Sequence, residues 1–444
     1  MEKHKILANI SSLSAEQLLE EIKHGNVSFT EIDNTGDLSP AKRKKIKELE
    51  AEAEKKDDEA WERARYGNEM MLSDYITRFP NGSHVEEAKK KIIYLEQARE
   101  AAQAEKQKVL KNIRNNSNSY FPDEIKEFLQ NGTLSESELE DCGIPSDVIE
   151  TLNDIEQHQH NLDLGERPQF IPEGYTEVYF WGIPGSGKTC ALAAILSKAE
   201  KLGYLNISIG PGYDYMTQLK NIFVDENALL PPPSPVDTTQ YLPFTLKKEN
   251  EKNHRSISLI ELSGEVFQCF YCKNAGKQMP SQDHEDTFNS LLSFLNSSNR
   301  KIHFFFIDYG NKNKKDPAGY TQSDYLSAAS TFFRHNQLFK KNTDAIYVVL
   351  TKSDLMPCPE NERVSKAKEY LYQDNFKAFI NTLKDSCKIN SINAGRLTVE
   401  PFSLGKVYFQ QICDFDGTTA ENIINILLDR VPTSKNSILD FFNR

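Results

Sequence analysis

Residues 176–190 read TEVYFWGIPGSGKTC, and this stretch decides the fold of the second half of the chain. Its first part, VYFW at 178–181, is apolar, β-branched and aromatic, which favours a buried strand. An alanine- and leucine-rich stretch with helical spacing follows Cys190. Between them, GIPGSGKT matches the pattern G-x-x-x-x-G-K-[ST] in the strand-then-helix context that a phosphate-binding loop (P-loop) requires.

The residue types of this loop suit phosphate groups. Glycines let backbone N–H groups turn inward around phosphate oxygens, and the helix start adds a favourable partial positive charge. Lys188 is expected to reach the β- and γ-phosphates, and the Thr189 hydroxyl to bind Mg²⁺. The alternative, a glycine-rich turn without nucleotide, does not explain both residues in register. The predicted nucleotide contacts are Gly182, Pro184, Gly185, Ser186, Gly187, Lys188, Thr189 and Cys190.

Length, charge and cysteine use exclude several classes of protein. The chain has 444 residues, which predicts two or three domains, and its net charge of −12 argues against general nucleic-acid or anionic-membrane binding. Seven scattered cysteines form no disulfide framework, and an odd number fits a reducing compartment. The N-terminus lacks the apolar region of a signal peptide, and no apolar run is long enough for a membrane span. We expect a soluble, cytoplasmic protein.

The first 160 residues carry helical patterns. Ser39-Pro40 starts a strongly charged stretch that we interpret as a solvated helical face. One helix with one apolar stripe is predicted from Trp61, Ala64, Asn68, Leu72 and Tyr75. After the turn FPNGSH, in which Ser83 is the expected cap, a second helix carries Val85, Ala88, Ile92 and Leu95. The pair resembles the hairpins of tetratricopeptide-like arrays, and one hairpin cannot bury its stripe alone, so a protein partner is expected.

A weak internal repeat relates residues 19–38 to residues 125–144. The matching pairs are Gly25 with Gly132, Val27 with Leu134, Ser28 with Ser135, Glu31 with Glu138, Ile32 with Leu139, and Gly36 with Gly143. We interpret them as two copies of one small helical unit on either side of the hairpin. Chance similarity between short amphipathic helices is the alternative. A true repeat would make this half an interaction module.

The second half alternates strands and helices. The strand candidates after the P-loop are residues 204–209, 241–246, 256–262, 302–307, 345–350 and 397–402. The predicted fold class is α/β, a doubly wound and mostly parallel P-loop NTPase sheet preceded by an all-α N-terminal region. The predicted parts are residues 1–57 (charged helical unit), 58–115 (hairpin), 116–160 (second copy), 161–174 (linker), 175–432 (P-loop domain) and 433–444 (C-terminal helix).

The sequence TKSD, 351–354, follows the apolar strand AIYVVL directly. It resembles the guanine-specificity motif [NT]-K-x-D of small-GTPase-like proteins. A carboxylate at Asp354 can accept hydrogen bonds from both the ring N–H and the exocyclic amine of guanine, a donor pair that adenine lacks. Lys352 is expected to pack along the nucleotide and Thr351 to lie beside it. An ordinary polar loop after a strand is the alternative.

The resemblance implies a D-x-x-G motif between these two, and ELSG at 261–264 takes its place. Glu261 is one methylene longer than the expected aspartate, which puts the metal geometry in doubt. The Gly264 amide suits the γ-phosphate. Glu265 stands where many members carry a glutamine that orients the attacking water, so Lys188 and Glu265 are the predicted catalytic residues. A surface-loop role for Glu265 is the alternative.

The resemblance also places a switch-I threonine just before the strand at 241–246. VDTT occupies 236–239, and Thr239 is favoured over Thr238. The predicted metal ligands are Thr189, Thr239 and Glu261. Near the C-terminus, FSLG at 402–405 resembles the family's fifth motif, in which Ser403 and Leu404 approach the base.

Two other groups of residues offer competing chemistry. Asp308 ends the apolar strand FFFID, the Walker B pattern of ATPases, although the spacing of Gly264 favours Glu261 as the metal-side acid. Cys269 and Cys272 form one C-x-x-C pair, and even with His284 as a third ligand this is weak evidence for a metal site.

Over residues 176–406 the chain is similar to P-loop GTPases of the translation-factor and Ras-like (TRAFAC) class, bacterial double GTPases among them. The resemblance implies GTP or GDP with Mg²⁺ as ligands and a switch that partners read. No arginine in the motifs offers itself as a finger, so slow hydrolysis is expected. Two alternatives stay open: an ATPase that uses Asp308, and a non-hydrolysing nucleotide-binding scaffold.

Overall fold

The computed structural model describes residues 2–155, 162, 171–224, 227–231, 239–311, 314–315 and 319–433. Most of the predicted linker (161–174), nearly all of the predicted C-terminal helix (433–444) and Thr238 lie outside the described residues. The chain forms two compact units, residues 1–110 and 111–444. In the part that the structure describes, no helix has the length and apolar character needed to cross a membrane.

The first unit is helical and begins with a small cluster of four helices. α1 to α4 share a core in which Ile6, Leu18, Ile32 and Ile46 are fully buried. Ser14 starts α2 with a capping box, in which its hydroxyl accepts a hydrogen bond from an otherwise unpaired backbone N–H. The helices are α1 (Lys3–Ala8), α2 (Ala15–Lys23), α3 (Phe29–Asp33), α4 (Pro40–Ala64), α5 (Glu69–Arg78) and α6 (Val85–Asn115), whose last turn belongs to the second unit.

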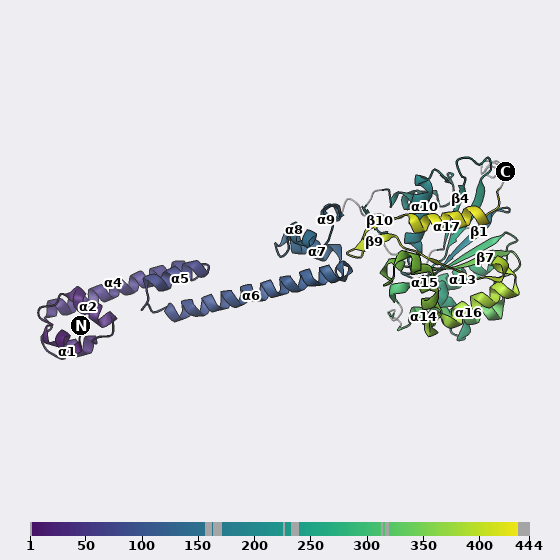
Figure 1. Ribbon diagram of the computed structural model, residues 1–444. Coiled ribbons are helices and arrows are strands. Elements are labelled where there is room, and N and C mark those ends of the chain that lie inside the picture. The colour runs from purple at the N-terminus through teal and green to yellow at the C-terminus, as the bar shows by residue number, and fades with distance from the viewer. Residues whose placement is uncertain are drawn as a thin grey trace. The chain divides into compact units, whose positions relative to one another are not determined.

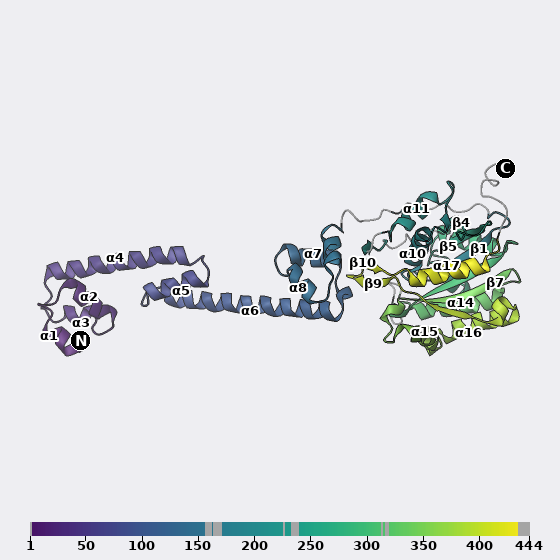
Figure 2. The same cartoon turned by 45° about the horizontal axis from the view of Figure 1, so that its top comes forward.

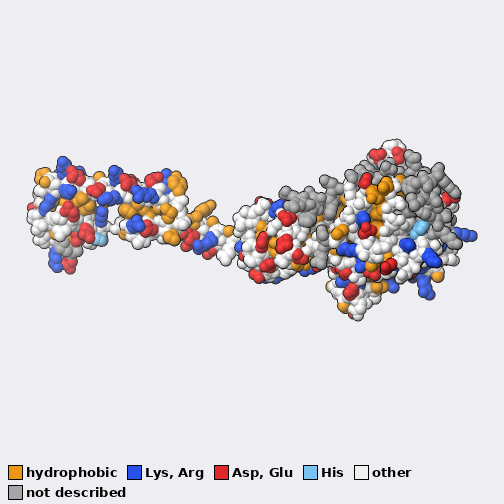
Figure 3. Space-filling view, turned by 90° about the horizontal axis from the view of Figure 1, so that it is seen from above, with side chains coloured by type: hydrophobic (Ala, Val, Ile, Leu, Met, Phe, Trp, Pro, Cys, Tyr) orange, Lys and Arg blue, Asp and Glu red, His pale blue; other side chains and the backbone are white. Residues whose placement is uncertain are grey.

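The charged stretch after Ser39 forms most of α4. Figure 3 shows acidic and basic side chains interspersed on one face of residues 1–110. Several pair along the helix, as Lys56 does with Glu52 at 2.8 Å. This stretch is therefore a solvated helical face, as predicted.

The prediction of one helix from Trp61 to Tyr75 is wrong. α4 ends four residues before Asn68, which caps a new helix, α5, by accepting a hydrogen bond from the Met71 backbone N–H. Asparagine side chains compete for backbone hydrogen bonds, and Gly67 before it weakens the helix further. Trp61 and Tyr75 still pack together across the turn, with ring centroids 5.5 Å apart.

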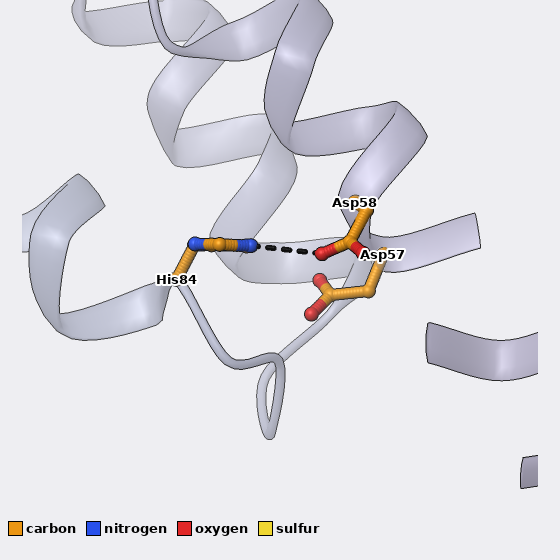
Figure 4. A group of neighbouring side chains, drawn as sticks. All are labelled: Asp57, Asp58 and His84. Atoms are coloured by element: carbon orange, nitrogen blue, oxygen red, sulfur yellow. Dashed lines mark hydrogen bonds and ion pairs between the residues drawn. The ribbon is translucent and has the colours of Figure 1, made fainter. Parts of the chain in front are cut away.

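Asp57 in α4 lies close to Asp58 and to His84, which precedes α6 (Figure 4). Its carboxylate accepts hydrogen bonds from the Tyr75 hydroxyl at 2.6 Å and from the Ser83 N–H and hydroxyl at 2.8 and 3.0 Å. The Ser83 hydroxyl thus binds Asp57. Among the described residues, only Asp57, Asp58 and His84 group donor atoms that could surround a metal ion. The hydrogen bonds of Asp57 explain its burial without one.

The two copies of the predicted repeat have the same local geometry. The N–H groups of Ser28 and Ser135 each donate to the glutamate three residues later, at 3.1 and 3.0 Å. Ile32 and Leu139 are fully buried at matching positions. The matching glycines all have positive φ: Gly25 (74°), Gly132 (73°), Gly36 (77°) and Gly143 (85°). The second copy consists of α7 (Pro122–Gln130), α8 (Glu136–Asp141) and α9 (Ser146–Asn153).

The second unit contains an α/β fold built on a sheet in the order β2-β4-β5-β1-β6-β7-β8. β1, β5, β6, β7 and β8 are parallel, and β4 runs antiparallel to β5, so the mostly parallel sheet is confirmed. The strands are β1 (Thr176–Trp181), β2 (Leu205–Asn206), β4 (Gln240–Leu246), β5 (Arg255–Glu261), β6 (Lys301–Asp308), β7 (Thr343–Thr351) and β8 (Thr398–Pro401).

Helices cover both faces of this sheet (Figures 1 and 2). Side chains of a strand alternate between faces, so Val178 and Phe180 of β1 join the core under α10, α11 and α17. Tyr179 and Trp181 join the core under α12, α13, α14, α15 and α16. The helices are α10 (Lys188–Lys201), α11 (Tyr213–Asn221), α12 (Val266–Asn274), α13 (Gln282–Leu295), α14 (Gln322–Asn336), α15 (Arg363–Leu371), α16 (Asp374–Ile389) and α17 (Thr418–Arg430).

A second small sheet, which the sequence did not predict, has the order β3-β10-β9. Its strands are β3 (Asn227–Leu229), β9 (Gly405–Tyr408) and β10 (Ile412–Phe415). The β9–β10 turn passes through Phe409 and Gln410, both with positive φ. The Asn118 side chain holds this turn, because it donates to the Val407 carbonyl at 2.9 Å and accepts from the Gln410 N–H at 2.7 Å.

A buried ion pair lies at the amino end of the parallel strands. Glu177 of β1 and Lys301 of β6 are 3.2 Å apart, with 0% and 2% of their side chains exposed. Glu177 also accepts from the Tyr179 hydroxyl at 2.7 Å and from the Asn299 amide at 3.0 Å. Lys301 also donates to the Ser297 carbonyl at 2.9 Å. Burial lowers the pKa of Lys301, and Glu177 opposes this shift.

Candidate functional site

GIPGSGKT forms the turn between β1 and α10, at the carboxyl end of the central strand. Gly185 and Gly187 have φ of 74° and 86°, in the region that favours glycine. At Gly182 a Cβ would lie 2.9 Å from the Phe306 carbonyl oxygen of β6. α10 begins at Lys188, so its first backbone N–H groups face the loop. The loop therefore has the backbone form that the sequence pattern requires.

Lys188 folds back over this loop and is 8% exposed. Its ammonium donates to the Gly182 carbonyl at 2.6 Å and to the Ile183 carbonyl at 3.1 Å. Burial lowers the pKa of Lys188 to about 8, and the nearby Glu261 carboxylate opposes this shift. Because phosphate oxygens bind an ammonium more strongly than neutral carbonyls do, these two contacts can be exchanged for a phosphate.

Glu261 ends β5 and contacts Thr189 at the start of α10. The Thr189 hydroxyl donates to one carboxylate oxygen at 2.5 Å, and the Tyr215 hydroxyl donates to the other at 3.1 Å. Burial raises the pKa of Glu261, while Thr189, Lys188 and Tyr215 oppose the shift. The contact follows from the strand order, because β5 is the direct neighbour of β1. Sequence reasoning missed Tyr215, which belongs to no motif.

Thr239 lies at the same end of β5, because its neighbour Gln240 pairs with Glu261 in the β4–β5 register. Thr239 is buried, and its hydroxyl has no hydrogen-bond partner among the described residues. Hydroxyl and carboxylate oxygens are the ligands that Mg²⁺ prefers. The predicted set of Thr189, Thr239 and Glu261 therefore fits a magnesium ion.

The turn after β5 touches the P-loop. A Cβ at Gly264 would lie 2.3 Å from the Pro184 backbone nitrogen, so only glycine allows this approach. Glu265 caps α12, and its carboxylate lies 2.7 Å from His284 Nε2 of α13. The two side chains are 17% and 11% exposed. The Glu265 carboxylate is thus largely buried and paired with His284. A residue with only a surface-loop role would be exposed.

The TKSD sequence, which begins at the end of β7, contacts the P-loop. The Thr351 hydroxyl donates to the Ser186 carbonyl at 2.9 Å. Lys352, at φ 55°, extends its ammonium to Asp308, 2.7 Å away. Asp308 also accepts from the Gly310 N–H at 2.8 Å. The two candidate acids thus have different partners, since Asp308 binds the lysine of TKSD and Glu261 binds the threonine of the P-loop.

Asp354 is joined to the loop after β8. Its carboxylate accepts a hydrogen bond from the Ser403 hydroxyl at 2.9 Å, and that hydroxyl in turn accepts the Gly405 N–H at 3.1 Å. The half-buried Leu404 is fixed in the same loop by the Asp416 N–H, which donates to its carbonyl at 2.8 Å. The structure therefore brings the predicted base-side residues together.

No protein-family model and no curated protein matches the chain. Solved structures do match, among them the crystal structure of a protein described as nucleolar GTP-binding protein 1 from Plasmodium falciparum. It is 14% identical to this chain, with a TM-score of 0.25, and the match covers 59% of this chain and 95% of that one. A likeness of this size does not assign a function to the chain.

The cysteines near the site are free thiols. Burial raises the pKa of Cys190, beside the P-loop, to about 11, with a further contribution from Glu261. Cys269 and Cys272 are buried in α12, and burial raises the pKa of Cys269 to about 12. Within the described residues, neither belongs to a group of donors that could hold a metal. At neutral pH Cys190 and Cys269 therefore act as small apolar side chains.

Proposed function

We propose that this protein binds GTP with Mg²⁺ and hydrolyses it slowly, and that its N-terminal helices bind a protein partner. One observation carries the proposal: the loops after β1, β5, β7 and β8 meet at one edge of one sheet. Hydrogen bonds join them in pairs, Thr189 to Glu261, Thr351 to Ser186, and Ser403 to Asp354. This edge is where open parallel α/β sheets bind ligands.

Guanine selectivity is assigned to Asp354, which Ser403 orients. Adenine would leave this carboxylate without its donor pair, and an unpaired charged group is costly. An ATPase that uses Asp308 has less support, because Asp308 is engaged by Lys352 and not by Thr189. Glu261 is therefore the proposed metal-side acid.

For hydrolysis, Thr189, Thr239 and Glu261 would hold Mg²⁺, which when bound neutralises charge on the β- and γ-phosphates. Lys188 and the loop N–H groups would stabilise the charge that develops on the leaving GDP. Glu265 would orient the attacking water. Because these motifs contain no arginine, turnover without a partner is expected to be slow.

Competition binding tests the guanine assignment. A fluorescent GTP analogue bound to the protein should be displaced by GTP at concentrations about 100-fold lower than by ATP, because only guanine satisfies Asp354. Asp354→Ala should remove most of this difference, while Asp385→Ala, an exposed carboxylate on α16, should not. ATP binding as tight as GTP binding, or full selectivity in Asp354→Ala, would contradict the assignment.

Single-turnover assays separate the GTPase from a scaffold that only binds nucleotide. Phosphate release that requires Mg²⁺ and is lost in Glu261→Gln supports hydrolysis at this site. GTP binding without phosphate release, with or without a partner, supports the scaffold.

A further inference from the structure

A chain of three side chains connects the turn after β5 to the start of α13. His284 Nε2 lies 2.7 Å from a Glu265 oxygen, and His284 Nδ1 lies 2.7 Å from the Ser281 hydroxyl. Ser281 is the N-cap of α13, so the imidazole is fixed from the helix start. Glu265 follows Gly264, whose backbone touches the P-loop at Pro184. The histidine therefore holds the carboxylate of the residue that follows Gly264, the glycine in contact with the phosphate-binding loop.

Both protonation states of His284 keep both contacts. In the neutral form, Nε2–H donates to Glu265 and the Ser281 hydroxyl donates to Nδ1. In the charged form, Nδ1–H donates to the Ser281 oxygen, because a hydroxyl both donates and accepts. The pair is electrically neutral when His284 is charged.

This charge matters because Glu265 stands where the resembling family has an uncharged glutamine. A carboxylate near the γ-phosphate repels it, and repulsion between like charges strengthens as water is excluded. A histidine bound directly to that carboxylate offsets the repulsion when its ring is charged. It also fixes the orientation of the carboxylate, which still has lone pairs for a further hydrogen bond.

We propose that His284 is a positioning residue for GTP hydrolysis, an inference that rests on the proposed function. It holds the Glu265 carboxylate in place, so that this carboxylate accepts a hydrogen bond from the attacking water. The water oxygen forms the new bond to the γ-phosphorus, and the bridging P–O bond breaks with its electron pair going to GDP. The water proton passes to Glu265 and then to the phosphate product. His284 contributes no atom to the products.

His284 could instead have a purely structural role, joining α12 to α13, and the chain offers a matched control for this alternative. Lys273 of α12 and Glu285 of α13 form an ion pair at 3.4 Å, with side chains 40% and 43% exposed. Glu285→Gln therefore removes another link between the same two helices and leaves Glu265 and His284 intact.

The test measures single-turnover GTP hydrolysis with Mg²⁺ and, separately, the Kd of a fluorescent GTP analogue. His284→Ala should slow hydrolysis about 10- to 100-fold with Kd changed less than about threefold, because the carboxylate loses its support and not its place in the fold. His284→Gln, which keeps an N–H donor near Nε2, should recover part of the rate. Glu285→Gln should match the wild type. Glu265→Gln with His284→Ala should be no slower than Glu265→Gln alone, because the two act as a unit.

Wild-type rates in His284→Ala, an equal loss in Glu285→Gln, or a further loss on top of Glu265→Gln would overturn this inference while GTP binding and hydrolysis by the wild type stand. A wild-type protein that binds no GTP, or that binds it and never releases phosphate, contradicts the proposed function itself and this inference with it.

Discussion

The two ends of the central sheet hold their charges differently. At the amino end, Glu177 and Lys301 are fully buried, bind each other and have further partners on all sides. At the carboxyl end, the Lys188 ammonium donates to two carbonyl oxygens of its own loop. There too, the buried hydroxyls of Ser186 and Thr239 have no hydrogen-bond partner within the described residues.

This difference indicates that the paired charges at the amino end stabilise the fold, whereas the polar groups at the carboxyl end bind a ligand. A buried charge that is paired and hydrogen-bonded ties strands together, and its loss leaves an uncompensated charge. Polar groups that the fold itself does not satisfy cost stability and are available to a ligand. Variants of the Glu177–Lys301 pair should therefore change stability alone, and variants of the Lys188 site should change binding.

The largest effect is expected at the amino end. Glu177→Ala should lower the free energy of unfolding of the α/β unit by about 3–5 kcal/mol, because Lys301 then remains buried without its partner. The Kd for GTP of the folded protein should not change. Denaturant unfolding and nucleotide titration measure the two quantities. Glu52→Ala, which breaks the exposed ion pair with Lys56, is the control and should cost less than about 1 kcal/mol.

Two results would contradict this prediction. One is a smaller loss of unfolding free energy in Glu177→Ala than in Glu52→Ala, and the other is weaker GTP binding by folded Glu177→Ala.

At the carboxyl end, Lys188→Ala should weaken GTP binding at least about 100-fold, because the phosphates lose a charge-assisted hydrogen bond in a buried site. The unfolding free energy should stay the same or rise, since a desolvated ammonium is removed. Nucleotide titration and denaturant unfolding of the same preparation test both parts. Tight GTP binding by this variant would contradict the proposal that Lys188 of the P-loop binds the phosphates.

The pH dependence sharpens this prediction. The pKa of Lys188 is lowered to about 8 in the folded protein, and the phosphates bind the ammonium form. GTP affinity should therefore be flat between about pH 7 and 8 and fall by up to about tenfold per pH unit above it. Because the unfolded chain binds this proton more tightly, the same group makes the free protein more stable as pH rises from about 8 to 10.5. In Lys188→Ala both slopes should disappear.

The smallest effect is expected at Thr239. Thr239→Val keeps the shape and removes a buried hydroxyl without a hydrogen-bond partner in the described structure, so stability should rise by about 1 kcal/mol. The Mg²⁺ concentration needed for hydrolysis should rise, because one proposed ligand is lost. Thermal unfolding and a Mg²⁺ titration test the two parts. A destabilised variant with unchanged Mg²⁺ dependence would assign Thr239 to the fold alone.

The features of the fold that depend on local sequence patterns could be predicted from the sequence. The P-loop and the alternation of strands with helices follow from glycine spacing and apolar runs, and these fix the edge where the motifs meet. The break at Asn68 was missed because apolar spacing continued across it. The β9–β10 hairpin was missed because its turn uses Phe409 and Gln410, neither of which marks a turn in sequence.

The pairing of Glu265 with His284 needed the structure. The residues are separated by α12 and the loop after it, and only the packing of α12 on α13 brings them together. In the sequence, a lone histidine near a C-x-x-C pair suggests at most a metal ligand. Sequence spacing alone therefore could not find this contact.

A crystal structure with Mg²⁺ and a non-hydrolysable GTP analogue tests the central claim most directly. We predict that the guanine N–H groups contact the Asp354 carboxylate, that the γ-phosphate contacts Lys188 and the Gly264 N–H, and that Thr189 binds Mg²⁺ on the Glu261 side of the loop. A base that lies away from Asp354, or a metal ion bound by Asp308, would contradict it.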